Sequence, residues 1–159
     1  MPEAGAEPQA SKLRERALGL LARREHSRVE LTRVELTRKL EQAGFDAADI
    51  RTLLDGFEAK KWLSDQRFAE SYVADHRART GSIKLAYDLR QRGVSDGIIE
   101  AVLGANRDSE LDRARIVWKK KFASAPADAA EKARHIRFMQ SRGFSSEIIR
   151  RVIKGTDDI

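Results

Sequence analysis

The sequence predicts an all-α protein of three tandem three-helix repeats, which are helix-turn-helix-like units that together form an elongated, curved helical array. Three observations support this fold class. A short glycine frame occurs three times in the 159 residues, at intervals of about 50 residues, a period found in repeat architectures. Apolar residues recur at helical spacing on both sides of each frame. No segment has the alternating pattern of a convincing strand.

Each frame has the composition of a helix end followed by a helix start. Glycine just past an apolar run supplies the left-handed backbone that ends a helix, and Asp or Ser two residues later can cap the next helix. The apolar residue before this cap and an isoleucine four residues into the new helix have the spacing of a hydrophobic staple. The three frames are Gly44, Phe45 and Ile50; Gly93, Val94 and Ile99; and Gly143, Phe144 and Ile149.

These signals divide the chain into segments. The expected segments are a disordered leader at 1–10, three-helix repeats at 11–63, 64–106 and 107–155, and a tail at 156–159. In the first repeat, helical spacing begins at Leu13, a second helix runs to Ala43, and a third runs from Asp46 to about Lys61. The sequence thus predicts three helices in this segment.

The second and third repeats follow the same order. In the second, the expected helices carry Phe68, Tyr72 and Val73, then Leu85 and Leu89 after a break at Thr80 and Gly81, and then residues 95–103. In the third, they carry Leu111, Trp118 and Phe122, then Ile136 and Met139 after a connection at Pro126, and then Ile148, Ile149 and Val152. Trp118 and Phe122 are four residues apart and are expected to face the core.

A tandem pentapeptide, residues 29–33 followed by 34–38, interrupts the first repeat. Five extra helical residues are expected to rotate everything before them by roughly 140° and to lengthen the helix by about 7.5 Å. Counted back from Leu40, Leu36 and Val29 fall on the same face, and Leu31 lies opposite. We therefore expect Leu36 to be buried and Leu31 to be more exposed.

The composition excludes several classes of protein. The chain has no cysteine, which excludes disulfides and thiolate sites and fits the cytoplasm. No apolar run approaches the roughly 20 residues needed to cross a bilayer, so no membrane association is expected. Charged residues make up 35% of the chain and the net charge is +6. An excess of this sign favours nucleic acid, or an assembly that contains it, as the partner.

The sequence shows no constellation typical of an enzyme. His26, His76 and His135 lie far apart, without a second ligand type at metal-binding spacing, and His26 and His135 are expected to be ordinary polar or capping residues. The glycines are single and do not form a phosphate-binding loop. We therefore expect a non-enzymatic protein without cofactor or metal.

Basic clusters are the candidate functional residues. Such charges neutralise phosphates and give salt-dependent affinity without reading bases. The clusters are Lys119, Lys120 and Lys121; Arg134, Arg137, Arg142, Arg150, Arg151 and Lys154; and Arg77, Arg79, Lys84, Arg90 and Arg92. Most of the individual charges also fit ordinary solvated helix faces.

Several motifs together resemble the RecX family of regulatory proteins. The resemblance rests on Ala17, Leu18, Leu21, Ala22, Arg23, Arg24, Glu25, His26 and Ser27, on Lys39, Leu40 and Gly44, on Trp62, Leu63, Ser64, Asp65, Arg67, Phe68 and Ala69, and on Gly81, Leu85, Leu89, Arg92, Gly93 and Val94. It covers roughly residues 13–155 and is weaker in the third repeat, where Arg142, Gly143 and Phe144 carry it. The doubled pentapeptide departs from the family pattern because it lengthens the first repeat.

The resemblance implies a partner and a function. It implies a monomeric cytoplasmic protein that binds the RecA recombinase filament on DNA, limits its extension, and inhibits its recombinase, ATPase and co-protease activities. Weak, nonspecific contact with single- or double-stranded DNA would accompany this role. Two alternatives remain: a protein that grips DNA directly and without sequence specificity, and a helical scaffold for another protein. The helices after the frames begin with small or acidic residues, which disfavours base reading.

Overall fold

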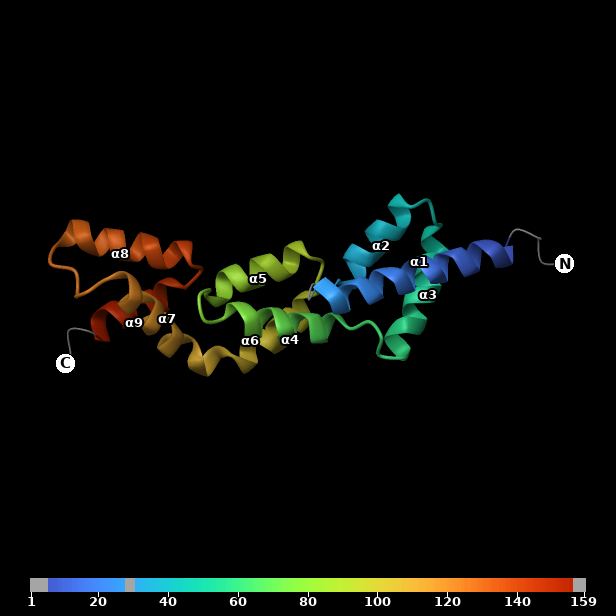
Figure 1. Cartoon of the computed structure of the whole chain (residues 1–159). Coiled ribbons are helices and arrows are strands. Elements are labelled where there is room, and N and C mark those ends of the chain that lie inside the picture. Colours follow the sequence, from blue (N-terminus) through green and yellow to red (C-terminus); the bar gives the residue numbers. More distant parts are fainter. Residues whose placement is uncertain (1–5, 28–30, 156–159) are drawn as a thin grey trace. The chain divides into compact units, whose positions relative to one another are not determined.

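The computed structural model describes the backbone of residues 6–27 and 31–155, and the side chains of 8–22 and 31–155. Within these residues the chain forms nine helices and no strand, which confirms the predicted all-α helical repeat (Figure 1). The helices are α1 (Ala6–Ser27), α2 (Arg33–Gln42), α3 (Ala47–Ala59), α4 (Asp65–His76), α5 (Ser82–Gln91), α6 (Asp96–Ala105), α7 (Arg107–Lys121), α8 (Ala129–Ser141) and α9 (Ser146–Gly155).

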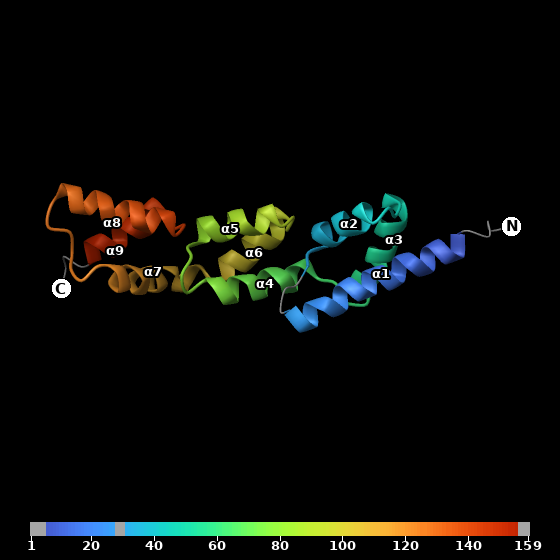
Figure 2. The same cartoon turned by 45° about the horizontal axis from the view of Figure 1, so that its top comes forward.

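The chain divides into two compact units. Unit 1 comprises Met1–Phe68 and Arg92–Val94, and unit 2 comprises Ala69–Gln91 and Ser95–Ile159. In unit 1, helices α1, α2 and α3 pack on one another around Leu13, Ala17, Leu36, Leu40, Ile50, Leu54, Phe57 and Leu63. In unit 2, helices α7, α8 and α9 pack on one another (Figure 2). Their core consists of Ala114, Val117, Trp118, Met139, Phe144, Ile149, Val152 and Ile153.

Helix α1 begins earlier than the sequence predicts. It starts at Ala6, so the expected disordered leader is wrong for residues 6–10. This segment contains alanine, glutamate and glutamine, which are good helix formers. Its proline, Pro8, lies in the first helical turn, where the missing N–H costs nothing.

Only part of the tandem pentapeptide is helical: among its described residues, Leu31 and Thr32 precede α2 and residues 33–38 lie within it. Helix α1 ends at Ser27 and α2 begins at Arg33, so the expectation of five extra helical residues is wrong. The duplication instead places Thr32 and Glu35 at the spacing of a capping box, and each accepts from the other's backbone N–H. The burial prediction is confirmed: Leu36 is buried and Leu31 is half-buried. Val29 lies outside the described residues.

The three frames have the predicted helix-ending backbone. Gly44, Gly93 and Gly143 have φ of 95°, 88° and 87°. Asp46 caps α3 by accepting from two backbone N–H groups, and Ser145 accepts from the N–H of Ile148 at 3.2 Å. Ser95 has an extended backbone before α6, but its side chain makes no capping hydrogen bond. The helix stops are therefore uniform, whereas the side-chain caps differ.

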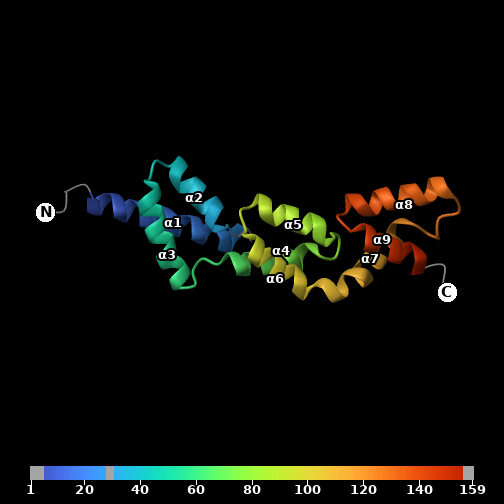
Figure 3. The ribbon, with the colours of Figure 1, turned by 180° about the vertical axis from the view of Figure 1, so that it is seen from behind.

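The third frame also joins two parts of unit 2, and we call such a contact between a glycine turn and the start of another helix a joint. The loop before α5 lies against the turn between α8 and α9 (Figure 3). The N–H groups of Gly81 and Ile83 donate to the carbonyls of Arg142 and Gly143, at 2.7 and 3.0 Å. A Cβ on Gly81 would lie 2.6 Å from the backbone nitrogen of Phe144. The backbone at Gly81 thus lies so close to the backbone of the α8–α9 turn that only glycine, which has no Cβ, fits there.

The second frame forms a matching joint within unit 1. The hydroxyl of Thr32, at the start of α2, donates to the carbonyl of Arg92, and a Cβ on Gly93 would overlap Val34. In both joints, the start of a repeat's second helix contacts the glycine turn of the following repeat. Gly44 of the first frame has no such neighbour, because a Cβ there would meet nothing within 4 Å.

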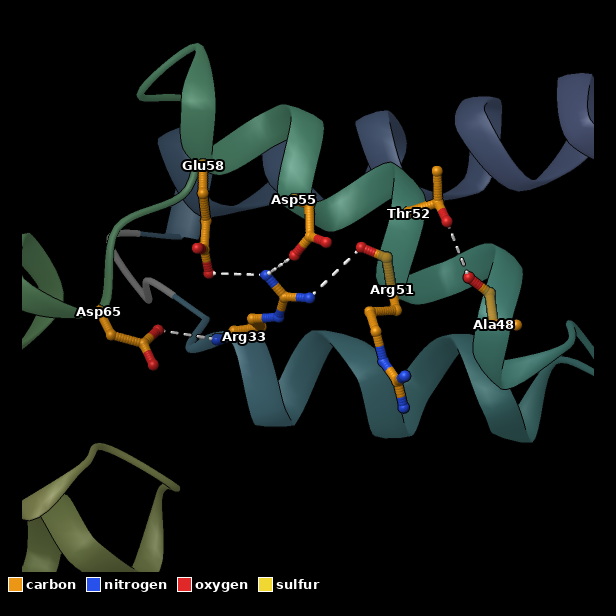
Figure 4. A network of polar contacts seen from close by, with 7 residues as sticks. All are labelled: Arg33, Ala48, Arg51, Thr52, Asp55, Glu58 and Asp65. Carbon is orange, nitrogen blue, oxygen red and sulfur yellow. Dashed lines mark hydrogen bonds and ion pairs between the residues drawn. The ribbon is translucent and has the colours of Figure 1, made fainter.

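A carboxylate from the following repeat completes each joint. Asp65 accepts from the backbone N–H of Arg33 at 2.8 Å, and the Arg33 side chain lies 2.7 and 3.0 Å from Asp55 and Glu58 (Figure 4). In unit 2, buried Glu110 accepts from both the backbone N–H and the hydroxyl of Ser82. Asp65 and Glu110 thus each cap the second helix of the preceding repeat.

His135 belongs to the core of unit 2. The sequence predicts an ordinary polar or capping residue, but the structure buries the ring, which accepts at Nδ1 from the Trp118 indole N–H at 3.0 Å. It also stacks on Phe122, with ring centroids 3.7 Å apart. Trp118 and Phe122 face the core as expected. The side chain of His26 lies outside the described residues.

Acidification is expected to destabilise unit 2 through His135. Burial lowers the pKa of His135 below its ordinary value of 6.5, against an opposing effect of Glu131. Because the folded-state pKa is the lower one, the neutral ring's stabilisation is complete above 6.5 and is lost as the pH falls through the folded-state value. Urea unfolding of a Trp62→Phe protein, followed by Trp118 fluorescence at roughly pH 7.5 and roughly pH 5.5, measures this loss.

His135→Asn is the control for this measurement. Its amide oxygen can accept from the Trp118 indole but does not titrate in this range. The variant should lose less of its unfolding free energy on acidification than the parent protein. Equal losses in the two proteins would show that His135 is not responsible.

Candidate nucleic-acid interface

A basic pocket of about 300 Å³ lies in unit 2. Three segments line it: the loop after α4, the end of α7 and the end of α8. Its lining residues are Ala78, Arg79, Val117, Lys120, Lys121, Phe138 and Arg142. Four of these residues are cationic and none is acidic, and all four cations are exposed. We call this set the basic pocket.

Local packing explains why these cations meet. On α7, Ala114, Val117 and Trp118 face the core, which leaves the lysines of the last turn on the surface. On α8, His135 and Met139 are buried, and Phe138 and Arg142 share a neighbouring face because they are four residues apart. The Gly81 to Arg142 hydrogen bond holds the loop of Arg79 against the end of α8.

Phe138 forms the aromatic wall of the basic pocket. The Lys121 ammonium lies 5.5 Å from its ring centroid and the Arg142 guanidinium lies 5.2 Å from it. Both distances fall within the range of cation–π attraction. Phe122 supports the ring from the core in an edge-on contact with centroids 5.5 Å apart. The cations are therefore held beside a fixed apolar surface, and their charges are not neutralised by any residue that lines the pocket.

The chemistry of the basic pocket is that of an anion site. Four cations within one pocket repel one another, and a bound phosphate group relieves this repulsion. Arg79 and Arg142 can bind phosphate oxygens in a bidentate manner, whereas the lysines act as point charges. The exposed setting makes such binding salt-dependent.

The described residues offer no candidate metal centre. No group of three or more His, Cys, Asp or Glu side chains could hold a metal ion in this part of the chain. In the same residues, no helix is both long and apolar enough to cross a membrane.

Comparisons with known proteins identify the family. A model of the RecX third three-helix domain matches residues 108–153, and a model of the RecX second three-helix domain matches residues 64–103. A protein named Regulatory protein RecX from Ralstonia nicotianae is 41% identical over 149 residues, which cover 94% of this chain and 91% of the relative. The chain belongs to the RecX family. A RecX relative from Chromobacterium violaceum is 42% identical, with 94% of each chain covered.

A solved structure supports the RecX fold. The crystal structure of RecX from Lactobacillus salivarius matches with a TM-score of 0.82, and the match covers 96% of this chain and 99% of that one. Its sequence identity is 22%, so this likeness concerns the fold alone.

In this member of the RecX family, residues from three predicted clusters meet in the basic pocket. Arg79, Lys120, Lys121 and Arg142 line it. The other predicted residues lie elsewhere. Arg77 donates to Asn106 at 3.0 Å, Arg90 pairs with Asp96 at 2.9 Å, and half-buried Arg92 lies over Phe68, 5.7 Å from its ring centroid. Lys84 packs against Gly143, Arg150 and Lys154 line a second groove, and Lys119, Arg134, Arg137 and Arg151 are exposed on their helices.

Phe138 is not among the candidate functional residues predicted from the sequence. The spacing of four residues between Phe138 and Arg142 could have indicated it, because this spacing places an aromatic and a cationic side chain on one helix face. The sequence does not reveal that Lys121 approaches the same ring from another helix. That contact depends on how α7 and α8 pack.

Proposed function

We propose that this RecX family member is a non-enzymatic regulator that binds the RecA recombinase filament on DNA. It inhibits filament extension and the recombinase, ATPase and co-protease activities of the filament, and thereby modulates DNA repair and the SOS response. It acts in the cytoplasm as a monomer. The relatives named as regulatory RecX proteins support the regulatory role. The basic pocket is the observation that supports contact with the filament's DNA.

The form of the pocket favours backbone contact over base reading. Its cations suit phosphates, which carry affinity without sequence information. The helices that follow the glycine turns begin with Ala47, Asp96 and Ser146, which are small or acidic. A sequence-specific reader displays Arg, Asn or Gln toward base edges at this place. The proposed DNA contact is therefore weak and nonspecific.

Inhibition of a recombinase filament tests the proposal. ATP hydrolysis by a RecA filament on single-stranded DNA is followed while the protein is added below the stoichiometry of the recombinase. We expect inhibition at these low ratios, because a regulator of filament extension acts on few filament sites. Absence of inhibition at any ratio would contradict the proposal.

A direct, sequence-nonspecific DNA-binding protein is the alternative. The exposed cations of the basic pocket also support this function. It predicts that ATP hydrolysis falls only when enough protein is present to coat the DNA. The dependence of inhibition on the protein-to-DNA ratio separates the two functions.

Removal of three cations from the basic pocket is expected to weaken DNA binding. In Lys120→Gln/Lys121→Gln/Arg142→Gln, up to three phosphate contacts are lost, so the slope of log K against log salt on single strands should fall by about 2. Fluorescence anisotropy of a labelled oligonucleotide across a salt series measures this slope.

A second triple variant, altered outside the pocket, is the control for the effect of net charge alone. Lys12, Arg14 and Arg38 are exposed residues of α1 and α2 in unit 1. Lys12→Gln/Arg14→Gln/Arg38→Gln has the same net charge as the pocket variant and should keep most of the parent slope. Equal slopes in the two variants would show that net charge, and not the pocket, carries the affinity.

A further inference from the structure

A second groove lies between α8 and α9 in unit 2, and it differs from the basic pocket. Its volume is about 440 Å³. Three isoleucines, Ile136, Ile149 and Ile153, provide its apolar lining, and three cations provide its charge. The complete lining is Lys132, Ile136, Ser146, Ile149, Arg150, Ile153 and Lys154. We call this set the isoleucine groove.

The sequence of α9 builds one side of this groove. Its lining residues on α9 follow the spacing i, i+3, i+4, i+7 and i+8, which is one face of a helix. Along this face Ile149 and Ile153 alternate with Arg150 and Lys154, each pair four residues apart. Lys132 and Ile136 on α8 repeat the combination of a cation and an isoleucine.

The cations of the isoleucine groove have no acidic partner in the described part of the chain. No carboxylate lines the groove, and Lys132, Arg150 and Lys154 are exposed. The nearby carboxylate of Glu131 accepts instead from the backbone N–H of Ala127 at 2.8 Å. An occupant that complements this groove therefore combines aliphatic side chains with negative charge.

We propose that the isoleucine groove binds an acidic, amphipathic segment of a protein partner. A helix laid in such a groove places apolar side chains four residues apart on the isoleucines and places carboxylates beside the cations. The groove lacks the aromatic platform on which nucleobases stack. Val152 points wholly into the core, and Ile149 and Ile153 are core residues that reach only the floor of the groove, so α9 has no open apolar face to lay on a membrane surface.

This inference divides the contacts between two faces. The isoleucine groove contacts protein and the basic pocket contacts DNA. This assignment of the two partners rests on the proposed function. Both sites lie in unit 2, and no residue lines both. Either site can therefore be altered without direct change to the other.

A designed peptide tests the isoleucine groove directly. The probe is a synthetic helical peptide with leucines at i, i+3, i+4 and i+7 and glutamates beside them, and a scrambled peptide of equal composition is its control. Methyl NMR spectra of the isoleucine-labelled protein should show saturable shifts of Ile136, Ile149 and Ile153 with the designed peptide and much weaker shifts with the scrambled one. Absence of these shifts overturns the proposal.

Charge variants and other ligands sharpen the test. Lys132→Gln/Arg150→Gln/Lys154→Gln should bind the peptide about tenfold more weakly. Arg134→Gln/Arg137→Gln/Arg151→Gln removes equal charge from the same two helices outside the groove and should bind almost as tightly as the parent. Larger shifts of the same methyl groups with a single-stranded oligonucleotide, or with vesicles that contain anionic lipid, would overturn the assignment to protein.

The recombinase assay separates this inference from the proposed function. If the groove variant inhibits the filament less than the parent but binds oligonucleotide equally well, the division of contacts is supported. If it inhibits as well as the parent, the division is wrong although the proposed function stands. If the parent protein itself does not inhibit, the proposed function fails, and the peptide titration still decides what the groove binds.

Discussion

Replacement of Gly143 by alanine is expected to destabilise unit 2 by about 3 kcal/mol. The left-handed backbone at φ 87° costs an alanine about 1–2 kcal/mol. The new Cβ would also overlap Lys84 Cβ and lie 2.8 Å from the Lys84 backbone nitrogen. The turn must then move away from α5, which weakens the hydrogen bonds from Gly81 and Ile83, each worth about 1 kcal/mol.

Gly44 provides a matched control for this substitution. It has nearly the same backbone, with φ 95°, but a Cβ there would meet nothing within 4 Å. Gly44→Ala should therefore cost only the backbone strain, about 1–2 kcal/mol. Urea unfolding followed by circular dichroism compares the two variants. Equal losses would show that the joint between the α8–α9 turn and α5 contributes nothing to stability.

The same contrast shows what the sequence can predict about the fold. The helix-ending role of the three glycines follows from local chemistry, because an apolar run, a glycine and a cap lie within a few residues. Their role in the joints does not, because Gly143 meets Lys84 only after the repeats have packed. Identical frames therefore occupy different environments, and only packing distinguishes Gly44 from Gly143.

The candidate site likewise has features that the sequence predicts and features that it does not. The sequence indicates the basic clusters because charge is a property of composition. It does not indicate that Arg79 and Lys121 meet around Phe138, since these residues come from three different helices or loops. His135 is a further case, because it lies between Arg134 and Arg137 in the sequence while its neighbours in the fold are Trp118 and Phe122. Contacts of this kind, between residues far apart in the sequence, can be identified only from the way the helices pack.

Replacement of Glu110 by alanine is expected to cost unit 2 about 2–3 kcal/mol. Glu110 is 6% exposed as a residue, and its carboxylate accepts two hydrogen bonds from Ser82 at the start of α5. Its removal leaves the backbone N–H of Ser82 without an acceptor at a helix end, and charged hydrogen bonds of this kind are worth about 1.5–3 kcal/mol. Glu110→Gln keeps an acceptor at this place and should lose only about 1 kcal/mol. Urea unfolding of both variants measures the difference, and equal losses would argue against the cap.

Asp65 in unit 1 allows the effect of the cap's negative charge to be separated from the effect of its hydrogen bond. It caps α2 as Glu110 caps α5, but it accepts one backbone hydrogen bond from Arg33, and burial raises the pKa of its carboxyl above the ordinary value of 3.8. A raised folded-state pKa means that ionisation disfavours the folded state, so this group's contribution to stability declines as the pH rises from 3.8 through the folded-state value. Asp65→Asn keeps an acceptor and removes this ionisation. At neutral pH it should therefore hold or slightly raise the unfolding free energy, whereas Asp65→Ala should lower it by about 1 kcal/mol. A large loss in the asparagine variant would show that the negative charge itself stabilises the joint.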